Sequence, residues 1–181
     1  MLAGYAQMKQ DVLGLQFDNV TMDEAVARAK ALLETPGASI VVTPNAEIGY
    51  EALHDAQFRA LLNGADLVLP DGAGVVLAAK LRRTPLKQKV AGVDFADRLL
   101  GVLAETGKTL YLLGGKPGIA ELAAEKMQEK HPGLVICGMA DGYFKDEGPV
   151  IEKINAAKPD VLFVCIGAPK QEIFMHAHRG E

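Results

Sequence analysis

The sequence lacks an excess of positive charge, a long apolar run and a recognisable leader. Its 19 basic residues are outnumbered by 23 acidic ones, and the net charge of −4 gives no general attraction to nucleic acid, so we expect no nucleic-acid partner. No apolar run approaches the roughly 20 residues of a membrane-spanning helix. The first residues lack the basic start and apolar stretch of a secretory signal. We expect a soluble cytoplasmic chain that touches a membrane only at its surface.

Cysteine and metal-binding patterns are equally sparse. The two cysteines, Cys137 and Cys165, each lie in an apolar run, which favours reduced and buried thiols over a disulfide or a metal site. There is no Asp-x-Asp pair, and the four histidines have no ligand spacing; His176 and His178 would diverge on a helix. We therefore expect neither a metal nor a cofactor.

Apolar runs of strand length alternate with longer segments of helical period, the pattern of parallel strands joined by helices. We expect an α/β fold, a Rossmann-like three-layer sandwich with a mostly parallel sheet, as one domain over residues 1–181 without a linker. The expected strands are a strand or hairpin at 12–20, then 39–43, 66–69, 109–113, 134–137 and 161–166. The expected helices begin at the Thr21–Glu24 capping box and cover 46–63, 72–81, 93–106, 117–130 and 148–157, with Pro117 in a first turn.

Ligands of such sheets bind beyond the carboxyl ends of the strands. Asp71 follows an apolar strand and Pro70 and precedes Gly72, which places a carboxylate at this rim. A sugar hydroxyl attacking an anomeric carbon needs a nearby base, and Asp71 can serve without a metal. Capping of the helix that starts at Gly72 explains the same position equally well.

Thr43 and Asn45 end the neighbouring strand, and their side chains can bond sugar hydroxyls or an acetamido group. Capping is again the alternative, with Asn45 as the N-cap of the next helix. Lys89 follows a cluster of basic residues and can neutralise a diphosphate leaving group that Gln171 helps to orient. Solvated surface charge is the alternative for this cluster.

The loop at 114–118, Gly-Gly-Lys-Pro-Gly, offers backbone N–H groups to a phosphate or a nucleobase edge. It matches neither the dinucleotide fingerprint nor the P-loop, and a tight turn explains it as well. The lack of a glycine fingerprint after the first strand disfavours a nicotinamide-dependent oxidoreductase.

Six motifs follow one another along the chain: TPNAEI at 43–48, LPDGAGVV at 69–76, KVAGVDF at 89–95, LYLLGG at 110–115, DGYF at 141–144 and IGAPKQE at 166–172. As an ordered set they resemble the WecG/TagA/CpsF family of bacterial glycosyltransferases. The TPNAE form is most similar to the branch that contains the N-acetylmannosaminyltransferases of wall teichoic acid synthesis.

The resemblance implies an inverting, metal-independent transfer of N-acetylmannosamine from UDP-N-acetylmannosamine to N-acetylglucosamine on undecaprenyl diphosphate. It implies that Asp71 is the general base and that Thr43 and Asn45 line the sugar site. It also implies that Gly114, Gly115 and Tyr143 lie near the nucleotide. Gln171 corresponds to the glutamine of the PKQE motif.

Two departures from the family matter. Lys89 stands where the family usually has arginine, so the charge is kept but the bidentate grip is lost. The family also continues beyond PKQE into a basic C-terminal appendage that this chain lacks. We therefore expect a core domain with an open site and low activity, self-association into a homo-oligomer, and membrane contact at the inner face only in a longer form.

Two alternatives stay open. The first is a transferase of the same family for another UDP-sugar, such as N-acetylmannosaminuronic acid or a capsule sugar. The second is a non-catalytic domain that binds a nucleotide sugar. Pocket details that decide the donor are not visible in the sequence.

Overall fold

Helices and strands alternate along the chain, and the expected α/β class is confirmed. The computed structural model describes residues 9–181, so the expectation about a leader concerns residues outside the described part. The strands are β1 (Lys9–Val12), β2 (Leu15–Asp18), β3 (Val41–Val42), β4 (Leu67–Val68), β5 (Thr109–Gly114), β6 (Val135–Ala140) and β7 (Val161–Cys165). The helices are α1 (Met22–Leu33), α2 (Ala46–His54), α3 (Ala56–Asn63), α4 (Ala73–Leu81), α5 (Gly92–Thr106), α6 (Ile119–Lys130), α7 (Gly148–Ala157) and α8 (Lys170–Ala177).

The residues group into two compact units. Among the described residues, unit 1 holds 9–32 and 39–95, and unit 2 holds 33–38 and 96–181. The single domain inferred from the sequence stays a prediction, and the two units are described one at a time.

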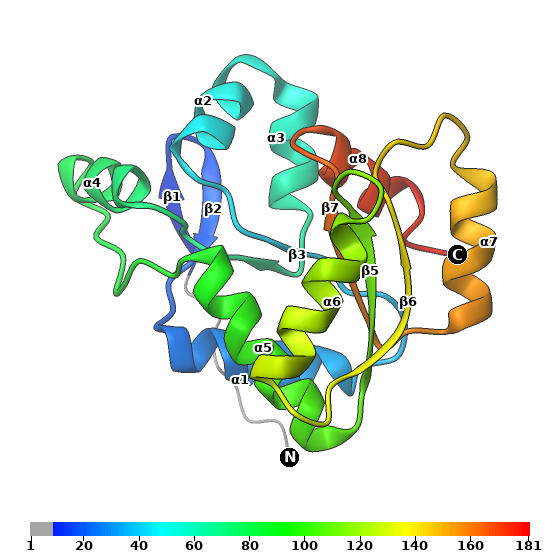
Figure 1. Cartoon of the computed structure of the whole chain (residues 1–181). Coiled ribbons are helices and arrows are strands. Elements are labelled where there is room, and N and C mark those ends of the chain that lie inside the picture. Colours follow the sequence, from blue (N-terminus) through cyan, green and yellow to red (C-terminus); the bar gives the residue numbers. More distant parts are fainter. Residues whose placement is uncertain (1–8) are drawn as a thin grey trace. The chain divides into compact units, whose positions relative to one another are not determined.

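Unit 1 contains two small sheets (Figure 1). Strands β1 and β2 form an antiparallel hairpin, and β3 pairs with β4 in parallel. Strand β4 and the residue after it are fully buried: Leu67, Val68 and Leu69 are all 0% exposed. Burial on every side explains why this segment is continuously apolar. Polar residues can therefore follow only after Leu69, where the chain leaves the buried strand.

The capping box at the start of α1 is confirmed. The Thr21 N–H donates to Glu24 Oε2 over 2.8 Å, and the Glu24 N–H donates to Thr21 Oγ1 over 3.3 Å. Lys87 binds the same carboxylate, and its hydrogen bond is the main cause that holds the pKa of Glu24 below its usual value.

The single helix expected over residues 46–63 is wrong, because Asp55 divides it. The Asp55 side chain accepts from the N–H groups of Gln57 and Phe58 and so caps α3. Its own N–H donates to the Glu51 carbonyl and closes α2. An extended backbone at Asp55 thus satisfies groups of both helices, which apolar periodicity alone does not reveal.

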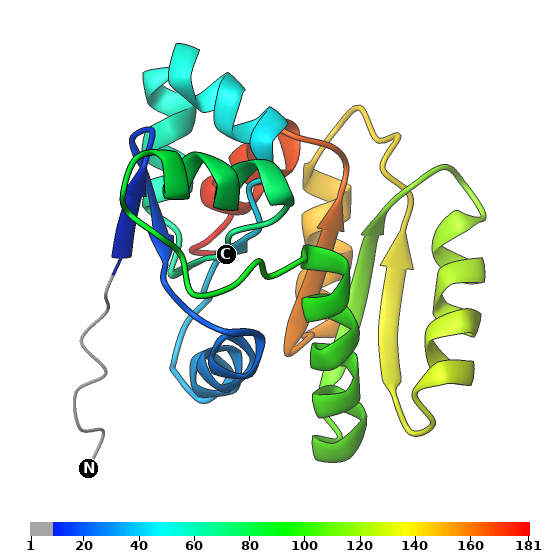
Figure 2. The ribbon, with the colours of Figure 1, turned by 90° about the vertical axis from the view of Figure 1, so that its left-hand side faces the viewer.

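Unit 2 is a three-layer sandwich around the parallel sheet β6-β5-β7 (Figure 2). Alternate residues of the central strand β5 serve opposite faces, as the period of a strand requires. Leu110 and Leu112 pack in one cluster with α5 and α6, whereas Tyr111 and Leu113 pack in another with α7 and Phe174. The expected layering is therefore present in this unit.

Two local expectations in unit 2 need correction. Pro117 does not lie in a first helical turn, because α6 begins at Ile119 after Gly118, whose φ of 86° makes it a left-handed N-cap. Residues 170–177 form a helix, α8, that was not among the expected helices.

His178 ties the end of α8 to neighbouring carboxylates and makes unit 2 sensitive to pH. Its Nε2 lies 2.9 Å from Glu147 and its Nδ1 lies 3.1 Å from Glu181, so only the protonated ring can donate to both. The bond to Glu147, followed by that to Glu181, raises the pKa of His178 above its usual 6.5. The stabilisation is complete below pH 6.5 and is lost as the pH rises through the higher folded-state value.

We expect unfolding of the chain in urea to become easier between about pH 6 and pH 8, by less than about 1 kcal/mol because the pair is partly screened by solvent. His178→Gln should remove this pH-dependent part. His54→Gln is the matched control, since His54 contacts a backbone carbonyl and Tyr50 rather than a carboxylate. Equal pH dependence in the wild type and His178→Gln would contradict this account.

Candidate functional site

The candidate site residues of unit 1 follow the ends of β3 and β4. The Asp71 N–H donates to the Pro44 carbonyl over 3.3 Å, and the Val90 N–H donates to the Pro70 carbonyl over 2.9 Å. Three segments far apart in the sequence therefore lie side by side beyond the small parallel sheet. This confirms that Thr43–Asn45 and Asp71 share one rim.

The Asp71 carboxylate is held by the start of α5. Its Oδ2 accepts from the Gly92 N–H over 3.0 Å, and the residue is half-buried. The alternative in which Asp71 caps the next helix is wrong. Gly72 is the N-cap of α4, and no side chain forms a capping hydrogen bond at this helix start. One carboxylate oxygen is therefore fixed by a backbone donor, while the helix that follows Asp71 starts without its help.

Gly92 leaves no room for a side chain between Thr43 and Asp71. A Cβ at residue 92 would lie 2.7 Å from Thr43 Oγ1 and 3.2 Å from Asp71 Oδ2. The Thr43 hydroxyl and the Asp71 carboxylate therefore border the same small space beside the Gly92 backbone. The three residues form a compact polar cluster, called here the Asp71 cluster.

Replacing Gly92 by alanine should disturb this cluster more than the fold. The new methyl group must displace the Thr43 hydroxyl, and a shift of about 1 Å in a reacting group costs up to about 100-fold in rate. In a form of the protein that shows catalytic turnover, we expect kcat to fall by about 10- to 100-fold. Gly49→Ala in α2 is the control, since its Cβ would meet nothing closer than 3.9 Å. Unchanged kcat in Gly92→Ala would disprove the tight packing.

The other two predicted residues of unit 1 differ in their surroundings. Asn45 is the N-cap of α2, and its Oδ1 accepts from the Ile48 N–H over 3.0 Å, so the capping alternative is present in the structure. Its amide N–H groups remain suited to a ligand. Lys89 is exposed and immediately precedes Val90, whose backbone joins the rim. A sugar or diphosphate role for either stays a prediction.

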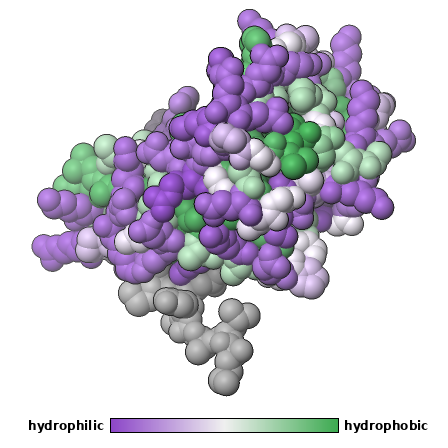
Figure 3. Space-filling model, turned by 60° about the horizontal axis from the view of Figure 1, so that its bottom comes forward, coloured by the Kyte–Doolittle hydropathy of each residue, from purple (hydrophilic) through white to green (hydrophobic). Residues whose placement is uncertain are grey.

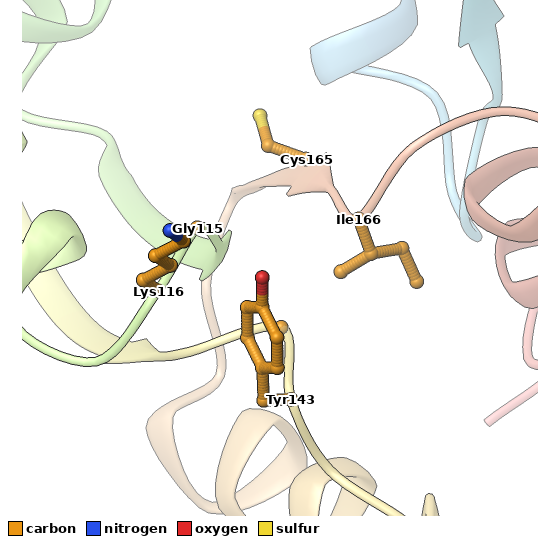
Figure 4. A pocket seen from close by; sticks show the side chains of 6 residues that line it. Gly115, Lys116, Tyr143, Cys165 and Ile166 are labelled. Carbon is orange, nitrogen blue, oxygen red and sulfur yellow. The ribbon is translucent and has the colours of Figure 1, made fainter.

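Unit 2 carries a pocket of about 370 Å³ at the carboxyl ends of β5, β6 and β7. Its lining residues are Gly115, Lys116, Gly142, Tyr143, Cys165 and Ile166. Figure 4 shows the Tyr143 ring between the Gly115–Lys116 turn and Ile166. Two of the predicted nucleotide-site residues, Gly115 and Tyr143, therefore line one pocket, together with the cation of Lys116.

The third predicted residue, Gly114, allows two strands to meet closely below this pocket. A Cβ there would lie 2.1 Å from the Cys165 carbonyl oxygen, and the φ of 141° is one that residues with side chains rarely adopt. The next N–H, that of Gly115, donates to the same carbonyl over 3.3 Å. Gly114 is thus required by backbone packing, and contact with a nucleotide is not needed to explain it.

Gln171 lies in the first turn of α8 with both ends of its amide engaged. Its Oε1 accepts from the Gly167 N–H over 3.2 Å, and its Nε2 donates to Glu172 Oε1 over 3.0 Å. Glu172 is 3% exposed, and its Oε2 has no hydrogen-bond partner within residues 9–181. The amide is therefore held in one orientation by its own loop and helix.

Cys165 departs from the expectation of two buried thiols. It ends β7 at the pocket and is exposed, whereas Cys137 is half-buried within β6; both are free. Nearby protein atoms still desolvate the thiol and raise the pKa of Cys165. The apolar pattern of β7 does not indicate that Cys165 and Ile166 line a pocket, and Lys116 was expected only as part of the glycine-rich loop.

Two further observations concern the described residues as a whole. Within residues 9–181, no group of three or more His, Cys, Asp or Glu side chains is arranged to hold a metal ion. Over the same range, none of the helices combines the length and the apolar character needed to cross a membrane. Metal independence and localisation stay predictions.

The family profile and the similar proteins agree on one family. The sequence profile of the "Glycosyl transferase WecG/TagA/CpsF family" matches residues 10–181. Proteins named N-acetylglucosaminyldiphosphoundecaprenol N-acetyl-beta-D-mannosaminyltransferase are similar to the chain. One from Bacillus spizizenii is 38% identical over 81% of this chain and 57% of its own length. One from Staphylococcus aureus is 30% identical over 96% of this chain and 69% of its own length. The chain spans little more than half the length of the Bacillus protein.

Proposed function

We propose, from the premise that this chain belongs to the WecG/TagA/CpsF family of glycosyltransferases, that it is the core of an N-acetylmannosaminyltransferase. The donor is UDP-N-acetylmannosamine, and the acceptor is N-acetylglucosamine linked to undecaprenyl diphosphate. The names of the similar proteins support this acceptor and this sugar. The product would serve the synthesis of wall teichoic acid.

The observation that carries the proposal is the position of Asp71. It is a half-buried carboxylate at a strand end, fixed through Oδ2 by the Gly92 N–H and next to the Thr43 hydroxyl. Such a group is oriented well for general base catalysis, because the atom that receives the proton is held in place before the substrate arrives.

In the proposed reaction, the acceptor 4-hydroxyl attacks the anomeric carbon of the donor from the face opposite UDP. The new carbon–oxygen bond forms as the bond to the diphosphate breaks, and the hydroxyl proton passes to Asp71. UDP leaves with the electron pair, and the configuration at the anomeric carbon is inverted. Thr43 and Asn45 bind sugar substituents, and Lys89 offsets charge on the diphosphate.

The pocket of unit 2 supports the role of nucleotide recognition. The Tyr143 ring supplies a flat apolar surface for a base, and Lys116 supplies a cation for a phosphate. Gln171 is positioned by Gly167 and Glu172 to offer an N–H to the donor. No metal is needed in this scheme, so transfer should persist in a chelator. A longer form would act at the inner face of the cytoplasmic membrane, and self-association of the chain belongs to the same proposal.

Incubation of the chain, and of a C-terminally extended form, with UDP-N-acetylmannosamine and a lipid-diphosphate N-acetylglucosamine acceptor tests the proposal. We expect a β-linked disaccharide lipid, formed at least by the extended form and unaffected by EDTA. A parallel reaction with UDP-N-acetylmannosaminuronic acid tests the other donor. Binding of UDP without product from either form or donor would contradict the proposal and favour a non-catalytic binding domain.

A further inference from the structure

Helix α4, which starts two residues after Asp71, exposes leucines on one face. Leu77 is 58% exposed and Leu81 is 76% exposed, whereas Val75 and Ala79 on the same helix are 5% and 0% exposed. Positions 77 and 81 are one helical turn apart and therefore lie on the same face. The helix is anchored on one side and presents an apolar stripe on the other. We call Leu77 and Leu81 the α4 stripe.

Next to the stripe lies the most basic segment of the chain. Residues 80–89 read KLRRTPLKQK and contain five cations and no acidic residue, in a protein whose net charge is −4. All five cations are exposed, and they are Lys80, Arg82, Arg83, Lys87 and Lys89. In the part of the chain that the structure describes, Lys87 is the one member that forms an ion pair, with Glu24.

The two features occupy one surface. Lys80 lies between the leucines in the sequence, and Arg82 caps the end of α4 directly after Leu81. Figure 3 shows hydrophobic atoms beside hydrophilic ones at the left-hand edge, the side on which Figure 1 draws α4. Apolar side chains flanked by lysine and arginine are the composition of helices that lie on the surface of an anionic bilayer.

We propose that the α4 stripe and the neighbouring cations Lys80, Arg82 and Arg83 form a docking surface for an anionic lipid membrane, while Lys87 stays paired with Glu24 and Lys89 keeps its role toward the diphosphate. The leucines enter the boundary between headgroups and acyl chains, and the cations contact the headgroups. A second copy of the chain fits less well, because it would bring the same positive charge against this surface. An uncharged protein groove would leave the cations without partners.

Docking of α4 also has a consequence for the Asp71 cluster, which rests on the proposed function. Gly72 joins Asp71 to α4, and each helical residue adds about 1.5 Å, so Leu77 lies within about 10 Å of the helix start. A lipid-linked acceptor carries its sugar just outside the bilayer surface. Contact through α4 therefore holds this end of unit 1 at the surface from which such an acceptor must approach.

Co-sedimentation of the 181-residue chain with vesicles tests the proposal. We expect binding to vesicles of phosphatidylcholine with about 30% phosphatidylglycerol, weaker binding at high salt, and little binding to phosphatidylcholine alone. Lys80→Gln with Arg82→Gln should weaken binding about 25-fold, since each headgroup contact contributes about fivefold. Leu77→Gln with Leu81→Gln should reduce binding to a similar or greater extent.

Matched controls lie elsewhere on the surface. Leu122→Gln removes a leucine of α6 that is 57% exposed, and Lys145→Gln with Lys153→Gln removes two exposed cations. Neither control should change vesicle binding by more than about twofold. Circular dichroism establishes that each variant is folded.

Three results would overturn the docking surface. The first is that the chain does not bind the anionic vesicles, and the second is that the control variants lose vesicle binding as much as the α4 variants do. The third is that the α4 variants change the oligomeric state while vesicle binding is retained. The last result would identify the α4 stripe as an interface between copies. Transfer to a short-chain, water-soluble acceptor should be unchanged in Leu77→Gln with Leu81→Gln. If no form transfers sugar but these variants still lose vesicle binding, the proposed function fails and the docking surface stands.

Discussion

Asp71→Asn is expected to reduce transfer by about 100- to 10,000-fold, the usual contribution of a positioned general base. Asparagine has nearly the same shape, and its Oδ1 can still accept from the Gly92 N–H that holds Oδ2 in the wild type. What it cannot do is take up the proton of the acceptor hydroxyl. The loss should therefore appear in kcat, with little change in the affinity for UDP.

The measurement requires a form that shows transfer, with kcat and KM followed for the donor and the acceptor. Asp94→Asn is the matched control, because it removes another carboxylate near the start of α5 that is exposed and belongs to unit 1. We expect the control to retain activity within about twofold, as a surface substitution away from the reacting atoms does. Near-normal turnover in Asp71→Asn would rule out its role as the base.

Local rules predicted the parts of the fold that local contacts determine. The capping box of α1 is visible in the spacing of Thr21 and Glu24, because each side chain bonds the backbone of the other. The break at Asp55 and the start of α6 at Ile119 were missed, since an apolar stripe continues through the first and a proline suggested an earlier start for the second. Both depend on the φ and ψ of one residue, which composition does not specify.

The candidate site shows the same division. Thr43 and Asp71 could be placed on one rim because parallel strands end at the same edge of a sheet. The partner of the carboxylate, Gly92, is 21 residues away in the sequence, and nothing in the pattern KVAGVDF indicates that its N–H meets Asp71. Long-range backbone donors of this kind are determined by packing, so they become known only from the structure.

Asp18 is a buried carboxylate of unit 1 whose loss should cost much of the chain's stability. Its side chain is 0% exposed, and it accepts from Arg28 through Oδ1 and from the Val68 N–H through Oδ2 over 2.8 Å. It thus joins β2, α1 and β4 around one buried carboxylate. Asp18→Ala leaves a guanidinium and a backbone N–H without their acceptor, which typically costs about 3–5 kcal/mol.

Urea unfolding followed by circular dichroism measures this loss, which is a large part of the roughly 5–15 kcal/mol that stabilises an ordinary domain. Asp11→Ala is the control, since Asp11 belongs to the same hairpin but is exposed.

A double-mutant cycle with Arg28→Ala separates the ion pair from the bond to Val68. If the ion pair contributes nothing to stability, the losses caused by Asp18→Ala and by Arg28→Ala should add in the double variant. If the orphaned charge dominates, removal of Arg28 should restore stability to Asp18→Ala, because the charge that lost its partner is then gone. We expect partial restoration, since the Val68 N–H remains unpaired in both variants, and a destabilisation by Asp18→Ala below about 1 kcal/mol would contradict the buried role.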